Sequence, residues 1–160
     1  MQIEISIAEQ RLKVLDDKGA MLAAYAVSTA LKGVGEEKNS YRTPRGKHVI
    51  RAKIGKDAPV NTIFKGRRPT GELWTPKLAE QHPGRDWILT RILWLSGCEP
   101  GHNRLGNVDT MQRYIYIHGT PDTELMGEPG SHGCIRMRNS EVLELFDLVP
   151  VGTPVLITDA

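Results

Sequence analysis

The sequence has little cysteine, no long apolar run and almost no net charge. Its two cysteines, Cys98 and Cys134, are too few for a disulfide-stabilised scaffold. No apolar stretch comes near the roughly 20 residues that a membrane-spanning helix requires. The formal net charge is only +2, and no long basic run is present, so the charge pattern of a nucleic-acid-binding protein is missing. We therefore expect neither a membrane nor a nucleic acid as a partner.

The N-terminus lacks the features of a secretory signal. It has no basic start, no apolar block and no small-residue cleavage site. Isoleucine alternates with polar residues instead, at Ile3, Ile5 and Ile7, a pattern typical of a strand. If Met1 is the native start, we expect a cytoplasmic protein; otherwise we expect a periplasmic one.

The chain of 160 residues is long enough for one domain, residues 1–160, with a hydrophobic core of its own. Alternating patterns and turn residues predict strands at 2–7, 11–16, 21–28 and 48–54. Residues 55–86 are rich in Gly, Pro, Lys and Arg and predict a long, loop-like insertion. We expect this insertion to act as a lid over a cleft; the alternative is a mobile decoration.

The second half of the chain adds two strands, at 88–96 and 113–118, before one clear helix. Asn139 or Ser140 is expected to cap this helix, and Pro150 to stop it. Its apolar stripe consists of Val142, Leu145, Phe146 and Val149. A last strand follows at 153–158. The predicted fold is mainly β and sandwich-like, with one C-terminal helix.

The most informative segment is the heptapeptide at 131–137, Ser-His-Gly-Cys-Ile-Arg-Met. In an extended segment, side chains at alternate positions leave the backbone on the same face. His132, Cys134 and Arg136 would then project together, and the apolar residues between and after them would face the core. A base, a nucleophile and a positive charge are thereby predicted in one place.

Cysteine chemistry explains why this grouping matters. The nucleophile is the thiolate, and a free thiol with a pKa of about 8.5 needs a nearby base or cation at neutral pH. His132 is expected to be that base for Cys134. Gly133 between them is expected to leave room for a substrate backbone. His118, at the end of a predicted strand, is a second imidazole, and a strand end is a natural rim for a site.

Together, Ile117-His118-Gly119-Thr120 and the heptapeptide resemble the signature of the L,D-transpeptidase catalytic domain family, also called YkuD. The similarity runs over nearly the whole chain, because the early strands, the Thr-Pro-Arg-Gly turn at 43–46 and the terminal helix and strand follow the family's order. The resemblance therefore implies an L,D-transpeptidase-like β-sandwich with one C-terminal helix and a long lid-like insertion.

The resemblance also assigns roles to single residues. It implies that Cys134 is the acyl-accepting nucleophile and that His132 is its base, with its other nitrogen held by a main-chain carbonyl. It makes His118 a second histidine lining the site. Gly133 occupies the motif glycine and is counted with the catalytic residues. Four further residues are expected to bind substrate or to support the site, and these are Ser131, Arg136, Tyr116 and Gly119.

The implied reaction is acyl transfer on peptidoglycan stem peptides or soluble muropeptides, without a metal or an organic cofactor. Cys134 would attack the carbonyl of the third residue of a tetrapeptide stem, a diamino acid, and the terminal D-alanine would leave. Main-chain N–H groups near Cys134 would stabilise the oxyanion. Carbapenem-type β-lactams are expected to acylate the same cysteine.

The acceptor then decides the biology. With water, the protein is an L,D-carboxypeptidase in cell-wall recycling, which we favour because no signal is visible. With an amine of a second stem or a free D-amino acid, it is an L,D-transpeptidase that forms cross-links or exchanges D-amino acids in the periplasm.

Two other classes of function stay open. The same Cys–His pair could serve a hydrolase of some other amide, which would not release D-alanine. Alternatively, Cys98 and His102 could join His132 and Cys134 in a zinc site of a non-enzymatic zinc- or peptide-binding module. Within the insertion, Arg67 and Arg68 are expected to be solvated, with contact to an acidic stem peptide as the alternative.

Overall fold

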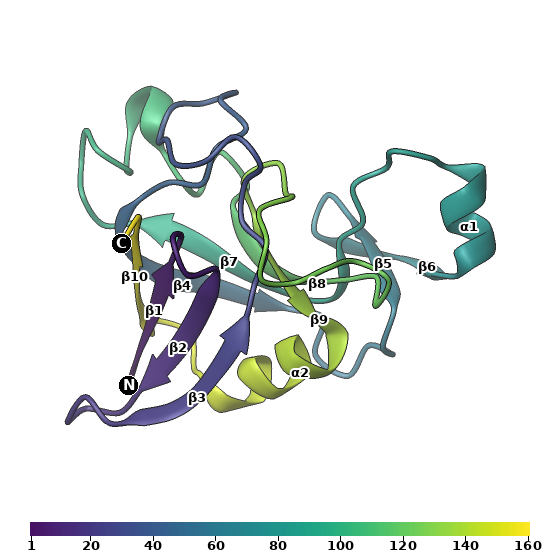
Figure 1. Ribbon diagram of the computed structural model, residues 1–160, viewed down its shortest axis with the longest axis horizontal. Coiled ribbons are helices and arrows are strands. Elements are labelled where there is room, and N and C mark those ends of the chain that lie inside the picture. Colours follow the sequence, from purple (N-terminus) through teal and green to yellow (C-terminus); the bar gives the residue numbers. More distant parts are fainter.

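The strands of the protein form one curved, hydrogen-bonded network (Figure 1). The structure is a computed structural model that describes residues 1–160. In chain order, the strands and helices are β1 (Gln2–Ser6), β2 (Arg11–Leu15), β3 (Met21–Ala26), β4 (Gly46–Ile54), β5 (Thr62–Lys65), β6 (Arg68–Leu73), α1 (Pro76–Gln81), β7 (Leu89–Gly97), the 3-10 turn η1 (Gly106–Val108), β8 (Tyr116–Thr120), β9 (Ile135–Arg138), α2 (Asn139–Leu148) and β10 (Pro154–Thr158).

The order of the strands brings the two ends of the network together. It runs β3-β2-β1-β10-β4-β7-β5-β6, and β8 branches from β7 and pairs with β9. The β1–β10 and β8–β9 pairs are parallel, and the others are antiparallel. Just beyond β3, Ser28 exchanges two main-chain hydrogen bonds with Arg136 of β9, at 3.0 and 2.9 Å. The curved sheet therefore closes at the heptapeptide, whose strand is held from both sides.

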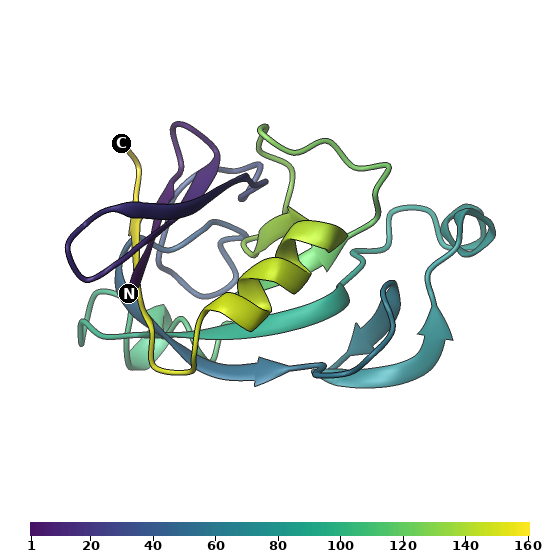
Figure 2. The same cartoon turned by 90° about the horizontal axis from the view of Figure 1, so that it is seen from below.

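The core lies between the curved sheet and α2, which packs on β7, β8 and β9 (Figure 2). The main cluster holds 19 buried apolar side chains, drawn from both ends of the chain. The predicted stripe of α2 is confirmed, because Val142, Leu145, Phe146 and Val149 are all buried in it. Ile135 and Met137 are fully buried there as well, as the alternation predicted. The mainly β fold is thus confirmed.

The prediction of a loop-like insertion was wrong. Residues 55–86 contain the hairpin β5–β6 and a second helix, α1, which extend to the right of the main sheet in Figure 1. A small apolar cluster of Ile63, Trp87 and Leu89 anchors them, with Trp74 and Leu78 packed against it. Thr75 caps α1 by accepting a hydrogen bond from the Leu78 N–H. These contacts are tertiary, so local composition did not reveal the elements.

Two local predictions also need correction. The cap of α2 is Arg138, whose side chain makes no capping hydrogen bond, and the Asn139 side chain instead accepts a hydrogen bond from the Thr90 hydroxyl at 2.5 Å. The strand expected from residue 113 begins only at Tyr116, because Tyr114 has a φ of 57°, which interrupts an extended backbone. None of the helices is long and apolar enough to span a membrane.

Candidate active site

The pairing of β8 with β9 puts the reactive side chains on one face of the sheet. Ile117 lies opposite Ile135, and His118 lies opposite Arg136. Ile117 and Ile135 are fully buried in the main core. Because side chains alternate along a strand, Tyr116, His118 and Arg136 leave on the other face. That face looks towards the insertion rather than towards α2.

Cys134 lies one residue before β9, on the same side as Tyr116, and its side chain is partly buried. Its Sγ accepts a hydrogen bond from the main-chain N–H of Tyr116 at 3.3 Å and donates to the carbonyl of Tyr114 at 3.4 Å. Burial raises the pKa of the Cys134 thiol to about 12, although the Tyr116 N–H opposes this shift. The thiol is therefore neutral at pH 7 and needs a base to become a nucleophile.

Cys134 opens into a cleft of about 540 Å³ that lies between the sheet and the insertion. From the sheet side come the two tyrosines and Ile92, and from the insertion come cationic residues and a carboxylate. The lining residues are Phe64, Lys65, Gly66, Arg67, Arg85, Asp86, Ile88, Ile92, Tyr114, Tyr116, His132 and Cys134. The insertion thus forms one wall of the cleft, as a lid would, but with regular structure.

His132 lines the cleft, but not because an extended strand places it on the same face as Cys134. Gly133 has a φ of +129°, so the chain is not extended between His132 and Cys134, and simple alternation fails there. The His132 side chain is 57% exposed and stacks edge-on against Tyr41, with ring centroids 6.1 Å apart. Its Nδ1 lies 3.9 Å from a carboxylate oxygen of Asp86. Both His132 and Cys134 line the cleft, but no hydrogen bond joins them.

The imidazole held by a main-chain carbonyl is that of His118, so the expectation that placed this contact on His132 was wrong. His118 Nδ1 lies 2.6 Å from the carbonyl oxygen of Gly119, while its Nε2 is buried without a partner. The side chain is fully buried, and burial lowers its pKa, which the negative charge of Asp86 opposes. A neutral ring that donates from Nδ1 leaves a free lone pair on Nε2.

Asp86 joins the insertion to the heptapeptide strand. Its carboxylate accepts a hydrogen bond from the Arg136 guanidinium at 2.8 Å and lies near both histidines. Burial would raise the pKa of this carboxyl, but His118, when it is protonated, and the Arg136 guanidinium hold that pKa below its usual value. Arg136 is therefore an anchor of the cleft wall, and only 13% of its side chain is exposed.

The small residues of the motif shape the backbone. A Cβ at Gly133 would meet Ile115 at 3.2 Å and the carbonyl oxygen of Arg42 at 3.3 Å. Gly133 therefore makes room for the protein's own chain, which corrects the expectation that it makes room for substrate. Ser131 is buried and braces the same turn, because its hydroxyl accepts from the Gly133 N–H and donates to the Cys134 carbonyl.

Gly119 has two functions in the structure. Its carbonyl accepts the hydrogen bond from His118. A Cβ at Gly119 would come within 2.6 Å of the Leu89 carbonyl and 2.5 Å of the Asn139 side chain, so only glycine fits between β7 and α2. Tyr116 is also placed as a supporting residue, because its N–H contacts Cys134 and its hydroxyl accepts a hydrogen bond from Arg67 at 3.0 Å.

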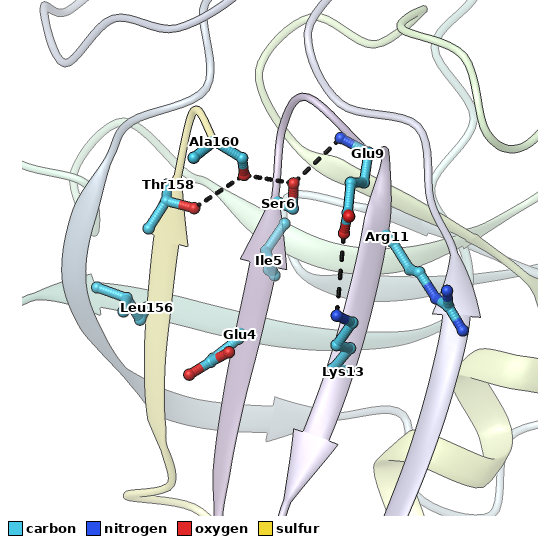
Figure 3. A pocket seen from close by; sticks show the side chains of 9 residues that line it. All are labelled: Glu4, Ile5, Ser6, Glu9, Arg11, Lys13, Leu156, Thr158 and Ala160. Atoms are coloured by element: carbon cyan, nitrogen blue, oxygen red, sulfur yellow. Dashed lines mark hydrogen bonds and ion pairs between the residues drawn. The ribbon is translucent and has the colours of Figure 1, made fainter. Parts of the chain in front are cut away.

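A second hollow, of about 210 Å³, lies on the other side of His132. His132 and Tyr114 line both spaces, but the rest of the second hollow is lined by Lys38, Asn39, Tyr41, Gln112, Arg113 and Ile115 rather than by the insertion. A third hollow, drawn in Figure 3, lies over β1, β2 and β10 at the opposite end of the molecule from the insertion. It contains neither cysteine nor histidine, and its Lys13 and Glu9 pair with each other at 3.9 Å. It offers no comparable chemistry.

The zinc alternative is not supported by the structure. No three side chains among the His, Cys, Asp and Glu residues come together as metal ligands. Cys98 is an exposed free thiol, and His102 lies 3.7 Å from Glu36 rather than near the cleft. The four residues proposed as ligands are therefore divided between separate places.

Sequence reasoning missed two residues of this site and gave a third, Arg67, only as an alternative substrate contact. The two missed residues are Asp86, from the insertion, and Arg113, whose pKa burial lowers and the nearby Cys134, when ionised, would raise. Arg113 is held by the carbonyls of Gly35 and Arg42, at 3.1 and 2.7 Å. No motif marks these residues, because each acts through a contact between distant parts of the chain.

Comparison with known proteins agrees with this geometry. The family model described as "YkuD: L,D-transpeptidase catalytic domain" matches residues 1–157. An Escherichia coli protein named as an L,D-transpeptidase, YbiS, is 31% identical over 133 residues, which is 77% of this chain and 42% of that protein. A Bacillus subtilis protein named in the same way, YqjB, is 60% identical over 47 residues, which is 29% of this chain and 27% of that protein. The chain thus matches less than half the length of these relatives.

A solved structure shares the fold. L,D-transpeptidase 3 from Mycobacterium tuberculosis, in complex with a faropenem-derived adduct, superposes with a TM-score of 0.59 at 17% identity, covering 98% of this chain and 59% of that one. At this identity, the match speaks for the fold alone. The family model, which extends over nearly the entire chain and includes the heptapeptide, decides the assignment: the chain belongs to the L,D-transpeptidase catalytic domain (YkuD) family.

Proposed function

We propose that the protein is a cysteine acyltransferase that cleaves peptidoglycan tetrapeptide stems between the third residue, a diamino acid, and the terminal D-alanine. The observation that carries the proposal is the position of Cys134. Its thiol lies at the wall of the cleft, and the strand register puts a carbonyl-held histidine diagonally across from it on the same face of the sheet. Membership of the family supports this substrate class.

We assign the role of base to His118 rather than to His132. The parallel register makes Cys134 a diagonal neighbour of His118 across β8 and β9, which is within reach of an aromatic side chain. The contact of Nδ1 with the Gly119 carbonyl orients the ring, and Nε2 is free to take the thiol proton. His132, which is mostly exposed, then serves as a wall of the substrate cleft.

The reaction then proceeds in two halves. The proton of the Cys134 thiol passes to His118 Nε2, and the sulfur attacks the carbonyl carbon of the third residue. The resulting tetrahedral intermediate collapses with cleavage of the C–N bond, and the proton on His118 goes to the nitrogen of the departing D-alanine. A thioester on Cys134 remains, which an acceptor attacks to regenerate the thiol.

A main-chain group is available for the oxyanion. The N–H of Cys134 donates a hydrogen bond to no other group of the protein. An N–H placed beside the nucleophile can stabilise the negative oxygen of the tetrahedral intermediate. The Tyr116 N–H, which contacts Sγ in the resting state, holds the sulfur in place beside it.

Two acceptors are proposed for different reasons. Water, which makes the protein an L,D-carboxypeptidase acting on soluble muropeptides in the cytoplasm, is the acceptor that the sequence favoured. An amine, which makes it an L,D-transpeptidase on the cell-wall side, is supported by the second hollow, since a second stem could reach the thioester past His132 while the first stem occupies the cleft.

We also propose that β-lactams of the carbapenem and penem type acylate Cys134. The structural relative from M. tuberculosis is described with a faropenem-derived adduct, and its fold is shared by this chain. Acylation would open the β-lactam ring and leave a thioester on the sulfur. The reaction needs the same base and the same oxyanion donor as the stem peptide does.

Product analysis tests the proposal. A purified disaccharide-tetrapeptide is incubated with the protein, with and without a D-amino acid, and the products are weighed by mass spectrometry. We expect free D-alanine together with a tripeptide if water is the acceptor, or with a dimer or an exchanged stem if an amine is. Cys134→Ala should release none, while Cys98→Ala, a change at the exposed cysteine, serves as the matched control and should retain full activity. D-alanine release by Cys134→Ala would refute the proposal.

A further inference from the structure

The wall of the cleft that the insertion contributes is strongly cationic. Lys65, Arg67 and Arg85 all line the cleft that contains Cys134. None of the three forms an ion pair in the structure. The only carboxylate of the cleft, Asp86, is occupied by Arg136 at 2.8 Å. The cleft therefore presents three positive charges without an anionic protein partner.

Arg67 is held in position before any ligand binds. Its guanidinium lies over the rings of Tyr114 and Trp94, with distances of 4.5 and 5.0 Å to the centroids, and donates to the Tyr116 hydroxyl at 3.0 Å. Arginine has several donors in a planar fork, and stacking fixes one face of that fork without using all of them. A preorganised cation loses less side-chain freedom when it binds an anion.

The backbone that carries Arg67 is unusual as well. Gly66 and Arg67 form the two-residue loop between β5 and β6, with φ values of 56° and 64°. Positive φ at both positions is what a type I′ hairpin turn requires, but an arginine at the second position is disfavoured relative to glycine or asparagine. A residue kept in such a conformation points to a role for its side chain.

Arg67 is connected to the nucleophile through one residue, Tyr116. Its guanidinium contacts the Tyr116 hydroxyl, and the main-chain N–H of the same tyrosine contacts the sulfur of Cys134. Arg85, which lines the same cleft, is held by stacking on Trp87, at 4.4 Å from the ring centroid. A peptide that acylates Cys134 therefore meets two arginines that the protein already holds in place.

We propose that Arg67, with Lys65 and Arg85, forms a carboxylate-binding subsite that selects peptides with a free carboxylate near the cleaved bond over the corresponding carboxamides. The inference rests on the proposed function and specifies its substrate class: the protein acts on anionic stems. Arginine binds a carboxylate through two parallel hydrogen bonds, which a carboxamide cannot match in charge or in acceptor number.

The test crosses protein variants with substrate variants. The tetrapeptide stem is prepared in its carboxylate form and in three forms that each replace one carboxylate by a carboxamide: on the second residue, on the side chain of the third residue, or at the C-terminus. kcat/KM is measured for the wild type, Arg67→Gln and Arg85→Gln. Arg68→Gln is the matched control, because Arg68 is an exposed neighbour in the same hairpin that does not line the cleft.

We expect one carboxamide to lower kcat/KM of the wild type by about 10- to 100-fold, the usual range for one charge-assisted pair. The same substitution should have little further effect in Arg67→Gln, since the partner is already gone. Arg68→Gln should behave as the wild type does. The carboxamide that shows this coupling identifies the bound carboxylate. If none of the three couples to Arg67 or Arg85, the subsite does not exist.

A second measurement works even if stems are not substrates. Alkylation of Cys134 by anionic iodoacetate and by neutral iodoacetamide is followed by mass spectrometry, with the exposed Cys98 of the same molecule as the internal reference. The subsite predicts a higher ratio of iodoacetate to iodoacetamide rates at Cys134 than at Cys98, and a fall of that ratio in Arg67→Gln but not in Arg68→Gln. A higher iodoacetate-to-iodoacetamide ratio at Cys134 without stem cleavage would overturn the proposed function and support the anion site. Stem cleavage without any charge preference would support the proposed function and overturn the anion site.

Discussion

The sharpest consequence of the site geometry concerns which histidine activates Cys134. Burial raises the pKa of the Cys134 thiol to about 12, so at pH 7 the unassisted thiolate fraction is only about one in 10⁵. A free thiol with a pKa near 8.5 would instead be a few per cent ionised. The difference of about three orders of magnitude is what a base within reach of the sulfur must supply.

We predict that His118→Gln lowers the rate of Cys134 acylation by faropenem about 10²- to 10⁴-fold at pH 7, the usual contribution of a general base. His132→Gln should lower it less than 10-fold, because His132 makes no hydrogen bond to the sulfur and acts on the cleft wall. The assay is the time course of the intact mass of the protein after faropenem is added.

The dependence of the acylation rate on pH should also differ between the wild type and His118→Gln. Burial lowers the pKa of His118 below 6.5, so the ring is neutral and can accept a proton throughout the neutral range. The wild-type rate should therefore fall only at pH values below 6.5, whereas in His118→Gln it should rise about tenfold per unit towards pH 10. Thermal melts establish that each variant is folded. A larger loss in His132→Gln than in His118→Gln, or a wild-type rate that already falls between pH 8 and pH 6.5, would refute the assignment.

Three further predictions concern charge and packing. The negative charge of Asp86 raises the pKa of His118, so Asp86→Asn should lower that pKa and move the acid limb of the acylation profile to lower pH. An unchanged acid limb would show that Asp86 does not influence His118. Burial lowers the pKa of His48 to about 4, so the unfolded state binds more protons between pH 6.5 and 4, and acidification over that range should cost about 3 kcal/mol of stability in denaturant melts. His48→Gln should remove that slope. Leu145→Ala should lower the free energy of unfolding by about 2–5 kcal/mol without changing the acylation rate per folded molecule, since Leu145 is fully buried in the core below β8 and β9.

The parts of the fold that could be predicted are those with a local period. Alternating isoleucines marked the first strand, and the spacing of Val142, Leu145 and Phe146 marked the only helix whose buried face is continuous. The elements of the insertion could not be predicted, because the hairpin and α1 are held by contacts of Ile63 with Trp87 and Leu89 rather than by their own sequence pattern.

The position of the site could be predicted from the sequence, but most contacts between its residues could not. The heptapeptide identified Cys134, and alternation placed Arg136 beside it correctly. Alternation failed at His132, because the positive φ of Gly133 breaks the strand one residue before the nucleophile. Asp86 and Arg136 are 50 residues apart in sequence, so their contact at 2.8 Å exists only in the folded chain. The spacing of residues along the sequence does not reveal charge pairs of this kind.

The most direct test of the central claim is to trap the acyl-enzyme. The protein is mixed with the tetrapeptide stem, quenched in acid within the first turnovers, and the intact mass and the modified peptide are determined. We predict a mass increase equal to that of the stem without its terminal D-alanine, located on Cys134 and absent from Cys98. Cleavage of the stem with no adduct on Cys134 in any quench, or an adduct that retains D-alanine, would contradict acyl transfer through this cysteine.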